Sequence, residues 1–124
     1  MLNRAIAAIC SFRVYANQDW EYEYWSAGCE RLFGYSVEEL TEKPLWMSRV
    51  DPEDLETIIL PLFKDFCAER EVRVEYRFRH KNGQIRWIAG TYASEKIAED
   101  CWIVTAVLYD ISEQKRLDAE RKQA

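Results

Sequence analysis

The chain has 124 residues, of which 48% are hydrophobic and 14% aromatic, so it suits one globular domain with its own core and not a disordered chain. Its formal net charge of −5 argues against a general nucleic-acid binder, which presents a basic surface. No apolar run approaches the roughly 18 residues of a membrane-spanning helix, and the start, MLNRAIAAIC, lacks the pattern of a signal peptide. We therefore expect a cytoplasmic domain without membrane contact. This leaves open a membrane anchor elsewhere in a larger parent protein.

The first part of the chain predicts a hairpin of two strands. Residues 7–15 are rich in apolar and aromatic side chains, and residues 20–25, WEYEYW, alternate aromatic and acidic ones. This period of two is typical of strands. The turn falls at residues 17–19, Asn-Gln-Asp.

Short helices are expected next, because residue types that begin and end helices follow each other closely. Ser26 can cap a short helix that Gly34 ends. Ser36 and Glu39 have the spacing of a capping box, in which each side chain bonds to the backbone of the other residue. Pro44 is expected to break the helical course after that segment.

The longest predicted helix runs from Asp51 to Ala68. Asp51 suits the cap, and Pro52 suits the first helical position. Pro61 lies inside the pattern and should kink the helix or end it early. Apolar residues recur at helical spacing along it: Leu55, Ile58, Ile59, Leu62, Phe63 and Phe66.

The second half returns to strand periodicity. Residues 72–79 alternate apolar and charged side chains, and Asn82-Gly83 is a turn signal before a return strand over residues 85–94. Another strand is expected over residues 102–109, and Ser112 is expected to cap a highly charged helix.

The order of elements predicts an α+β fold, in which an antiparallel sheet has helices on one face. The last two predicted strands are apolar on both faces. One face should pack on the helices, and the other should be covered by a flanking helix or a second subunit.

Four motifs in this order resemble the PAS family of sensor modules found in bacterial histidine kinases. Any one of them is weak, but the four together are specific, and the resemblance extends from about Ile6 to Arg116. The matching stretches are YWSAGCERLFGYSVEEL (24–40), DPED (51–54), the hairpin with EYR (75–77), KNG (81–83) and RW (86–87), and DISEQK (110–115).

The resemblance implies a PAS-like five-stranded antiparallel sheet, a sensor domain over residues 1–111 and the start of a signalling helix over residues 112–124. It implies a homodimer and an effector domain further along the same chain, often a histidine kinase. It also implies that the last strand is coupled to the outgoing helix. Residues expected to take part in this coupling are Asp110, Ile111, Ser112 and Trp87, although Trp87 also fits a purely structural role in the core.

A ligand pocket between sheet and helices is a further implication, but the fold hosts many ligands and sometimes none. A small apolar or aromatic ligand and a pocket filled by side chains both stay open, and so does the ligand's identity. Residues expected to line the pocket, each of which also suits an ordinary core, are Phe12, Trp46, Phe63, Tyr76, Phe78 and Ile103.

The common cofactors of the family find little support in the residues. The flavin-binding members carry an Asn-Cys-Arg-Phe-Leu-Gln run, whereas residues 38–43 here contain no cysteine. Haem-binding members place a histidine on the long helix, and residues 51–68 contain none. His80 is expected at an exposed hairpin tip, and Cys67 is expected to be a buried thiol and not an iron ligand.

The four cysteines are widely spaced and form no C-x-x-C pair. They are Cys10, Cys29, Cys67 and Cys101. With a single histidine in the chain, this argues against a zinc site.

An enzyme is disfavoured because no set of nucleophile, base and orienting residue is visible. A pure dimerisation or protein-interaction module without ligand is the remaining alternative to a sensor.

Overall fold

The computed structural model describes residues 7–123. Residues 1–6, which the expected domain 1–111 includes, and Ala124 lie outside the described residues. In chain order the elements are β1 (Ala7–Tyr15), β2 (Trp20–Trp25), α1 (Ala27–Phe33), α2 (Val37–Thr41), α3 (Lys43–Arg49), α4 (Pro52–Asp54), the π-helix η1 (Leu55–Ile59), α5 (Leu62–Cys67), β3 (Val72–Arg79), β4 (Ile85–Ala98), β5 (Cys101–Asp110) and α6 (Ser112–Gln123).

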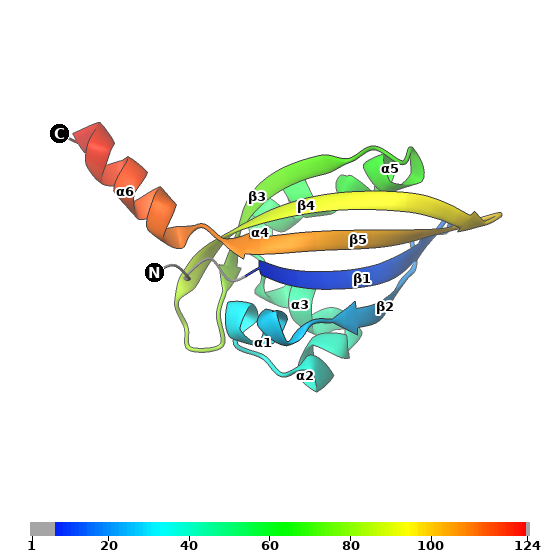
Figure 1. The fold of residues 1–124 in the computed structure, drawn as a ribbon, viewed down its shortest axis with the longest axis horizontal. Coiled ribbons are helices and arrows are strands. Elements are labelled where there is room, and N and C mark those ends of the chain that lie inside the picture. Colours follow the sequence, from blue (N-terminus) through cyan, green and yellow to red (C-terminus); the bar gives the residue numbers. More distant parts are fainter. Residues whose placement is uncertain (1–6, 124) are drawn as a thin grey trace.

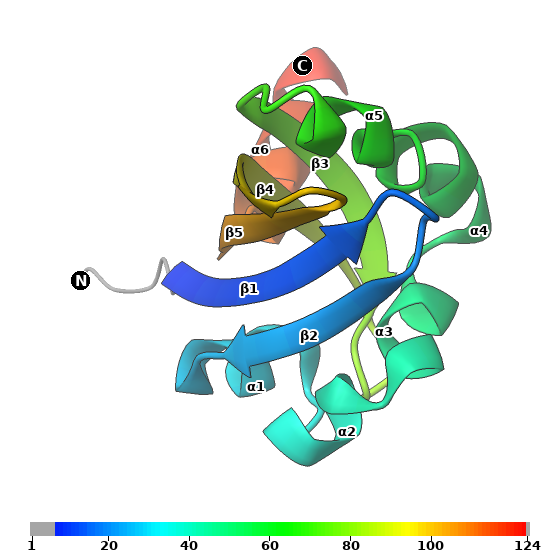
Figure 2. The ribbon, with the colours of Figure 1, turned by 90° about the vertical axis from the view of Figure 1, so that its right-hand side faces the viewer.

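The strands form one five-stranded sheet in the order β2-β1-β5-β4-β3, and every neighbouring pair is antiparallel. The helices between β2 and β3 lie on one side of this sheet (Figure 1, Figure 2). Helix α6 leaves the end of β5 and extends away from the sheet (Figure 1). This arrangement confirms the predicted α+β class with helices on one face.

The core lies between the helices and the inner face of the sheet, as the period of two in the strands predicts. The inner side chains of the central strand β5 are Trp102, Val104, Ala106 and Leu108, and all four are buried. On the edge strand β3, Tyr76 and Phe78 are fully buried. The outer face keeps exposed apolar side chains such as Ile9 and Tyr109.

The short helices begin and end where the sequence predicts. The hydroxyl of Ser36 accepts the N–H of Glu39, and the Glu39 carboxylate accepts the N–H of Ser36, which confirms the capping box. Gly34 ends α1 in the left-handed conformation, with a φ of 85°. The Ser26 hydroxyl makes no cap bond; it accepts the N–H of Ile9 and so ties the start of α1 to β1.

The helical region around the three prolines differs from the prediction at Pro44 and at residues 55–59, which form the π-helix η1 and not a continuous α-helix. Pro44 does not break a helix, because it lies in the first turn of α3, where its missing N–H is not needed. Asp51 caps α4 by accepting the N–H groups of Glu53 and Asp54. The predicted break at Pro61 is confirmed, since it separates η1 from α5.

Among residues 7–123, no helix combines the length and the apolar character needed to cross a lipid bilayer.

Candidate functional site

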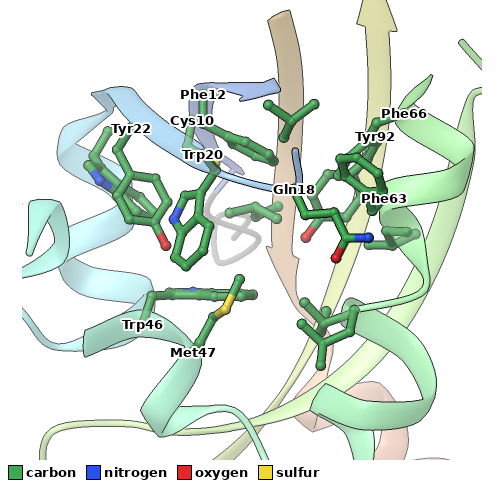
Figure 3. Close-up of a pocket in the computed structure, with 16 residues that line it drawn as sticks. Cys10, Phe12, Gln18, Trp20, Tyr22, Trp46, Met47, Phe63, Phe66 and Tyr92 are labelled. Atoms are coloured by element: carbon green, nitrogen blue, oxygen red, sulfur yellow. The ribbon is translucent and has the colours of Figure 1, made fainter. Parts of the chain in front are cut away.

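An apolar cavity of about 370 Å³ lies between the inner face of the sheet and the helical segments α3, η1 and α5. Figure 3 shows Trp46 and Met47 on one side of it, Trp20 and Tyr22 on a second side, and Phe63 and Phe66 across from them. The residues that line it are Cys10, Phe12, Val14, Gln18, Trp20, Tyr22, Trp25, Trp46, Met47, Ile59, Leu60, Leu62, Phe63, Phe66, Tyr92 and Leu108.

Every one of these side chains is uncharged in its ordinary state near neutral pH. The three cavity side chains that can ionise are held neutral by their surroundings. Burial raises the pKa of the Cys10 thiol far above its usual value, and the nearby Cys29 adds to this. Burial also raises the pKa of Tyr22 to about 12 and that of Tyr92 well above its usual value. The wall therefore carries no charge across the physiological pH range.

Aromatic contacts hold the cavity walls in place. Phe12 packs edge-on against Phe66, with ring centroids 5.7 Å apart, and so joins β1 to α5. Tyr22 packs against Trp25 at 5.0 Å. Trp46 packs on the buried Tyr76 at 5.6 Å, which fixes the wall that α3 contributes. Such pairs favour these tilted and edge-on geometries, so the cavity is a built feature of the core.

The structure places the six predicted pocket residues in three different environments. Phe12, Trp46 and Phe63 line the cavity. Tyr76 and Phe78 lie in the closed core and are fully buried. Ile103 was placed wrongly, because it lies on the outer face of β5, where its partners across the sheet are Arg13 and Glu95. Its neighbour Trp102 takes the inner position.

Several lining residues escaped the sequence prediction although a signal for some was present. Trp20 and Tyr22 share one face of the alternating stretch WEYEYW, and this period of two could have placed both on the cavity side. Trp25 joins them after a register shift between Ser11 and Phe12 on β1, which an unaligned sequence does not reveal. Gln18 lies at the mouth and has a left-handed backbone, with a φ of 73°.

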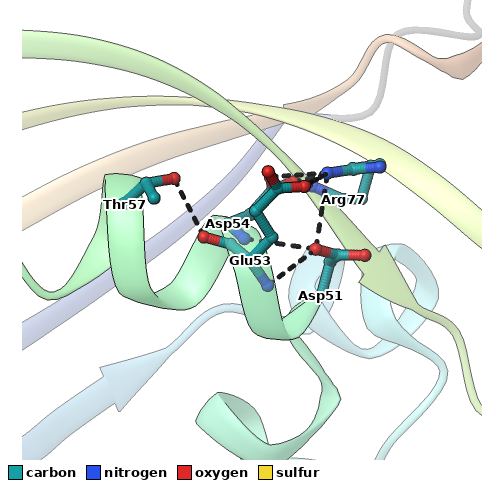
Figure 4. A network of polar contacts seen from close by, with 5 residues as sticks. All are labelled: Asp51, Glu53, Asp54, Thr57 and Arg77. Carbon is teal, nitrogen blue, oxygen red and sulfur yellow. Dashed lines mark hydrogen bonds and ion pairs between the residues drawn. The ribbon is translucent and has the colours of Figure 1, made fainter.

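An acidic cluster at the start of α4 faces Arg77 of β3 (Figure 4). Carboxylate oxygens of Asp51, Glu53 and Asp54 lie within 4.8 Å of one another. The Nη2 atom of Arg77 lies 3.4 Å from Asp51, 3.4 Å from Glu53 and 2.8 Å from Asp54. The guanidinium therefore takes the place that a cation would occupy, and the hydrogen bond from Arg77 lowers the pKa of Asp54.

The junction between β5 and α6 is held by the backbone of Trp87 on β4. The N–H of Trp87 donates to the hydroxyl of Ser112 at 2.9 Å, and its carbonyl accepts the N–H of Ile111 at 2.8 Å. The Asp110 carboxylate accepts the N–H of Ser112 at 2.9 Å. Thus the cap bond at the helix start comes from Asp110, and the expected cap role of Ser112 is corrected, since its hydroxyl bonds to β4.

The side chain of Trp87 lies between two cations. The Nζ atom of Lys115 on α6 is 4.6 Å from the ring centroid, and the Arg77 guanidinium is 5.5 Å from it. Lys115 also pairs with Glu75 of β3 at 2.8 Å, and this hydrogen bond lowers the pKa of Glu75. The residues expected to couple sheet and helix therefore meet at one place, and Asp110 pairs there with Arg86 of the hairpin at 3.6 Å.

The two residues weighed as iron ligands lie away from the cavity. His80 is half-buried against Gly34, which corrects the expected exposed tip position, and its Nδ1 accepts the N–H of Asn82. Cys67 is half-buried at the end of α5 and does not belong to the lining. A haem or a flavin nucleotide brings carboxylates or phosphates, for which the uncharged wall offers no countercharge. The lining contains no histidine for haem iron and no cation for a flavin phosphate.

Known proteins resemble this chain along most of its length. A family model described as "PAS fold" matches residues 22–102. A blue-light-activated histidine kinase from Brucella anthropi is 29% identical over 96 residues, which cover 77% of this chain and 19% of that protein. The chain thus spans about a fifth of the length of this curated relative.

Solved structures share the fold at lower identity. The N-terminal domain of a diguanylate cyclase with a PAS/PAC sensor from Marinobacter aquaeolei has a TM-score of 0.71 and 19% identity, with 86% of this chain and 98% of that chain covered. The PAS domain of a protein from Colwellia psychrerythraea has a TM-score of 0.70 and 23% identity, with 87% and 88% covered. Since the matched family model covers more than half of the residues, the chain belongs to the PAS family.

Proposed function

We propose that this chain is the sensory PAS domain of a larger signalling protein, in which a change in the pocket or in a dimer passes to an output segment through α6. The domain has a sensory role and no catalytic activity of its own in this proposal. Its homology to the histidine kinase from Brucella anthropi supports this assignment. Residues 1–111 would form the sensor, and residues 112–124 would begin the signalling helix.

The observation that carries the proposal is a continuous line of contacts from the cavity to α6. Ile59 lines the cavity, and its helical segment η1 starts directly after Asp54. Asp54 binds Arg77 of β3, and the Arg77 guanidinium lies over the ring of Trp87. A shift of the helical segment that bears Asp54 would therefore move the groups that hold Lys115 and α6.

The outer face of the sheet supports the proposal of a homodimer. Ile9 and Tyr109 lie on this face and are 44% and 39% exposed. Apolar side chains on a sheet face favour cover by another protein surface. In a larger parent the output would be a kinase or another effector on the same chain, working in the cytoplasm without membrane contact by this domain.

The alternative of a pure interaction module is weaker because the cavity is not filled by side chains. A volume of about 370 Å³ falls within the roughly 300–1,000 Å³ of small-molecule sites. A domain used only for dimerisation would gain stability from a filled core. The cavity therefore favours a sensor over a scaffold.

The decisive experiment is to break the line of contacts at its pocket end and observe α6. Asp54→Asn removes the charge that holds Arg77. Asp65→Asn, on α5, removes a more exposed pair with Arg70 and is the matched control. The Lys115 N–H donates to the Ile111 carbonyl, so its exchange with solvent reports the first turn of α6. NMR should show faster exchange at Lys115 in Asp54→Asn only.

Amides in the middle of β5 provide the internal reference, because their exchange reports opening of the whole sheet. Faster exchange at Lys115 relative to this reference supports coupling through Arg77. An unchanged Lys115 amide in Asp54→Asn would refute the proposed route.

A further inference from the structure

The chemistry of the cavity wall restricts what the pocket can hold. All sixteen side chains that line it are uncharged, and the ionisable ones among them, Cys10, Tyr22 and Tyr92, are held in their neutral forms by burial. A charged group that entered would lose its water without gaining a partner of opposite charge. Burying a charge without a partner costs several kcal/mol. An anionic or cationic ligand is therefore disfavoured by the wall itself.

The aromatic lining and the volume of the cavity favour a compact aromatic molecule. Indole and phenyl rings form much of its wall, and Figure 3 shows Trp20, Trp46 and Phe63 arranged around the open centre. Aromatic side chains pack with aromatic partners through offset and edge-on contacts. The volume of about 370 Å³ is at the small end of the range for small-molecule sites, which suits two or three rings.

One flexible polar side chain lies at the mouth. Gln18 is exposed, and Figure 3 shows its carboxamide at the cavity between Trp20 and Phe63. Its left-handed backbone, with a φ of 73°, is held by the hydrogen bond from its N–H to the Tyr15 carbonyl at 2.8 Å. Since a carboxamide both donates and accepts hydrogen bonds, it can hold one polar group of a ligand whose rings lie deeper.

We infer that the pocket binds an uncharged aromatic molecule of two or three rings, with its polar group at Gln18. This inference rests on the proposed sensory function and adds the ligand class to it. The ligand is defined by its chemistry alone, as a neutral aromatic metabolite that partitions from water into an apolar site.

A pair of probes that differ by one charged group tests the ligand class directly. N-phenyl-1-naphthylamine is neutral, and 8-anilino-1-naphthalenesulfonate is the same ring system with a sulfonate. Both fluoresce when they leave water. We expect saturable one-to-one binding of the neutral probe and at least about tenfold weaker binding of the sulfonate, since the wall has no cation. Equal or tighter binding of the sulfonate, or no saturable binding of the neutral probe, overturns the inference.

Two lysine substitutions locate the binding. Leu60 lines the cavity and is 50% exposed, so Leu60→Lys puts a cation at the wall without burying it. It should weaken the neutral probe and strengthen the sulfonate. Ile97→Lys, at a position 46% exposed on β4 and outside the lining, should leave both affinities unchanged. The same response to both substitutions would place the probes on the surface and overturn the inference.

The failure of the ligand class differs from the failure of the proposed function. If the sulfonate binds better while Asp54→Asn still loosens α6, the coupling stands and the ligand class falls. If the neutral probe binds in the cavity while α6 ignores Asp54→Asn, the ligand class stands and the coupling falls.

Discussion

Asp54 and Arg77 are joined by three hydrogen bonds that tie the end of α4 to the edge strand β3. The Asp54 carboxylate accepts the backbone N–H of Arg77 at 2.8 Å, its Nε–H at 2.9 Å and its Nη2–H at 2.8 Å. Asp54 is buried, with 5% of its surface exposed, while the Arg77 side chain keeps 33%. This bidentate geometry is the strong form of an ion pair.

Loss of the Asp54 charge should lower the free energy of unfolding. In Asp54→Ala the backbone N–H and the guanidinium of Arg77 lose their acceptor, and we expect a loss of about 2 kcal/mol. This is below the cost for a fully buried pair because Arg77 retains contact with water. Urea denaturation followed by tryptophan fluorescence measures it. Asp65→Ala, at an exposed pair, is the control and should cost below about 1 kcal/mol; equal losses would contradict the argument.

The same pair predicts a loss of stability in acid. Arg77 holds the pKa of Asp54 below its ordinary value, so the folded state binds a proton there less readily than the unfolded chain. The contribution is full above the ordinary carboxyl pKa of about 4 and is lost as the pH falls through the lower folded value. Urea midpoints measured from pH 6 down to pH 3 should fall less steeply in Asp54→Asn than in the natural chain. Parallel curves would show that other carboxylates carry the acid sensitivity.

The Ser112 hydroxyl should matter through β4 and not through its own helix. Ser112→Ala leaves the half-buried N–H of Trp87 without its acceptor, and we expect a loss of about 1 kcal/mol with faster exchange of the Trp87 amide. Ser112→Thr keeps the hydroxyl and is the matched control. If threonine and alanine give the same exchange rate, the hydrogen bond to Trp87 is not what holds this junction.

Asp110 should affect the helix more than the domain. Asp110→Ala removes the acceptor of the Ser112 N–H and a pair with Arg86 at 3.6 Å, which together are worth about 1 kcal/mol. The Lys115 amide should exchange several-fold faster, and in a full-length parent the output should change. Asp100→Ala, in the turn between β4 and β5, is the control. A loss of several kcal/mol without any change at Lys115 would assign Asp110 to the fold alone.

Much of this architecture is readable from local patterns in the sequence. The alternation in WEYEYW and in residues 72–79, the Ser36–Glu39 capping box and the Asp51-Pro52 start each depend on neighbours within a few residues. These elements lie where the patterns predict them. The outward position of Ile103 follows from register, which is fixed by pairing with β1 and β4 and is not visible in an apolar run such as CWIVTAVLY.

The candidate site was only partly predictable because it depends on contacts between distant segments. The Asp54–Arg77 pair spans 23 residues, and the Glu75–Lys115 pair joins a strand to the final helix. The cavity itself depends on volume left between side chains, which no spacing rule reports. Gln18 lies at its mouth with a left-handed φ of 73°, and the sequence marks that position only as a turn.

Gly34 provides a test of how the end of α1 is joined to the hairpin of β3 and β4. Its φ of 85° is left-handed, where a residue with a Cβ pays about 1 kcal/mol. A Cβ at this position would also lie 2.7 Å from both ring nitrogens of His80, and closer still to Cε1. Gly34→Ala should therefore cost more than backbone strain alone, about 2–4 kcal/mol.

Gly83 at the hairpin tip separates the two contributions. Its φ is 94°, and a Cβ there would meet no atom within 4 Å, so Gly83→Ala should cost only the strain of about 1 kcal/mol. In a His80→Ala background, Gly34→Ala should fall to the same cost, because the ring that it strikes is gone. Urea denaturation of these variants in a double-mutant cycle measures the difference. If the cost of Gly34→Ala is unchanged without His80, the backbone and not the packing of α1 against the hairpin sets it.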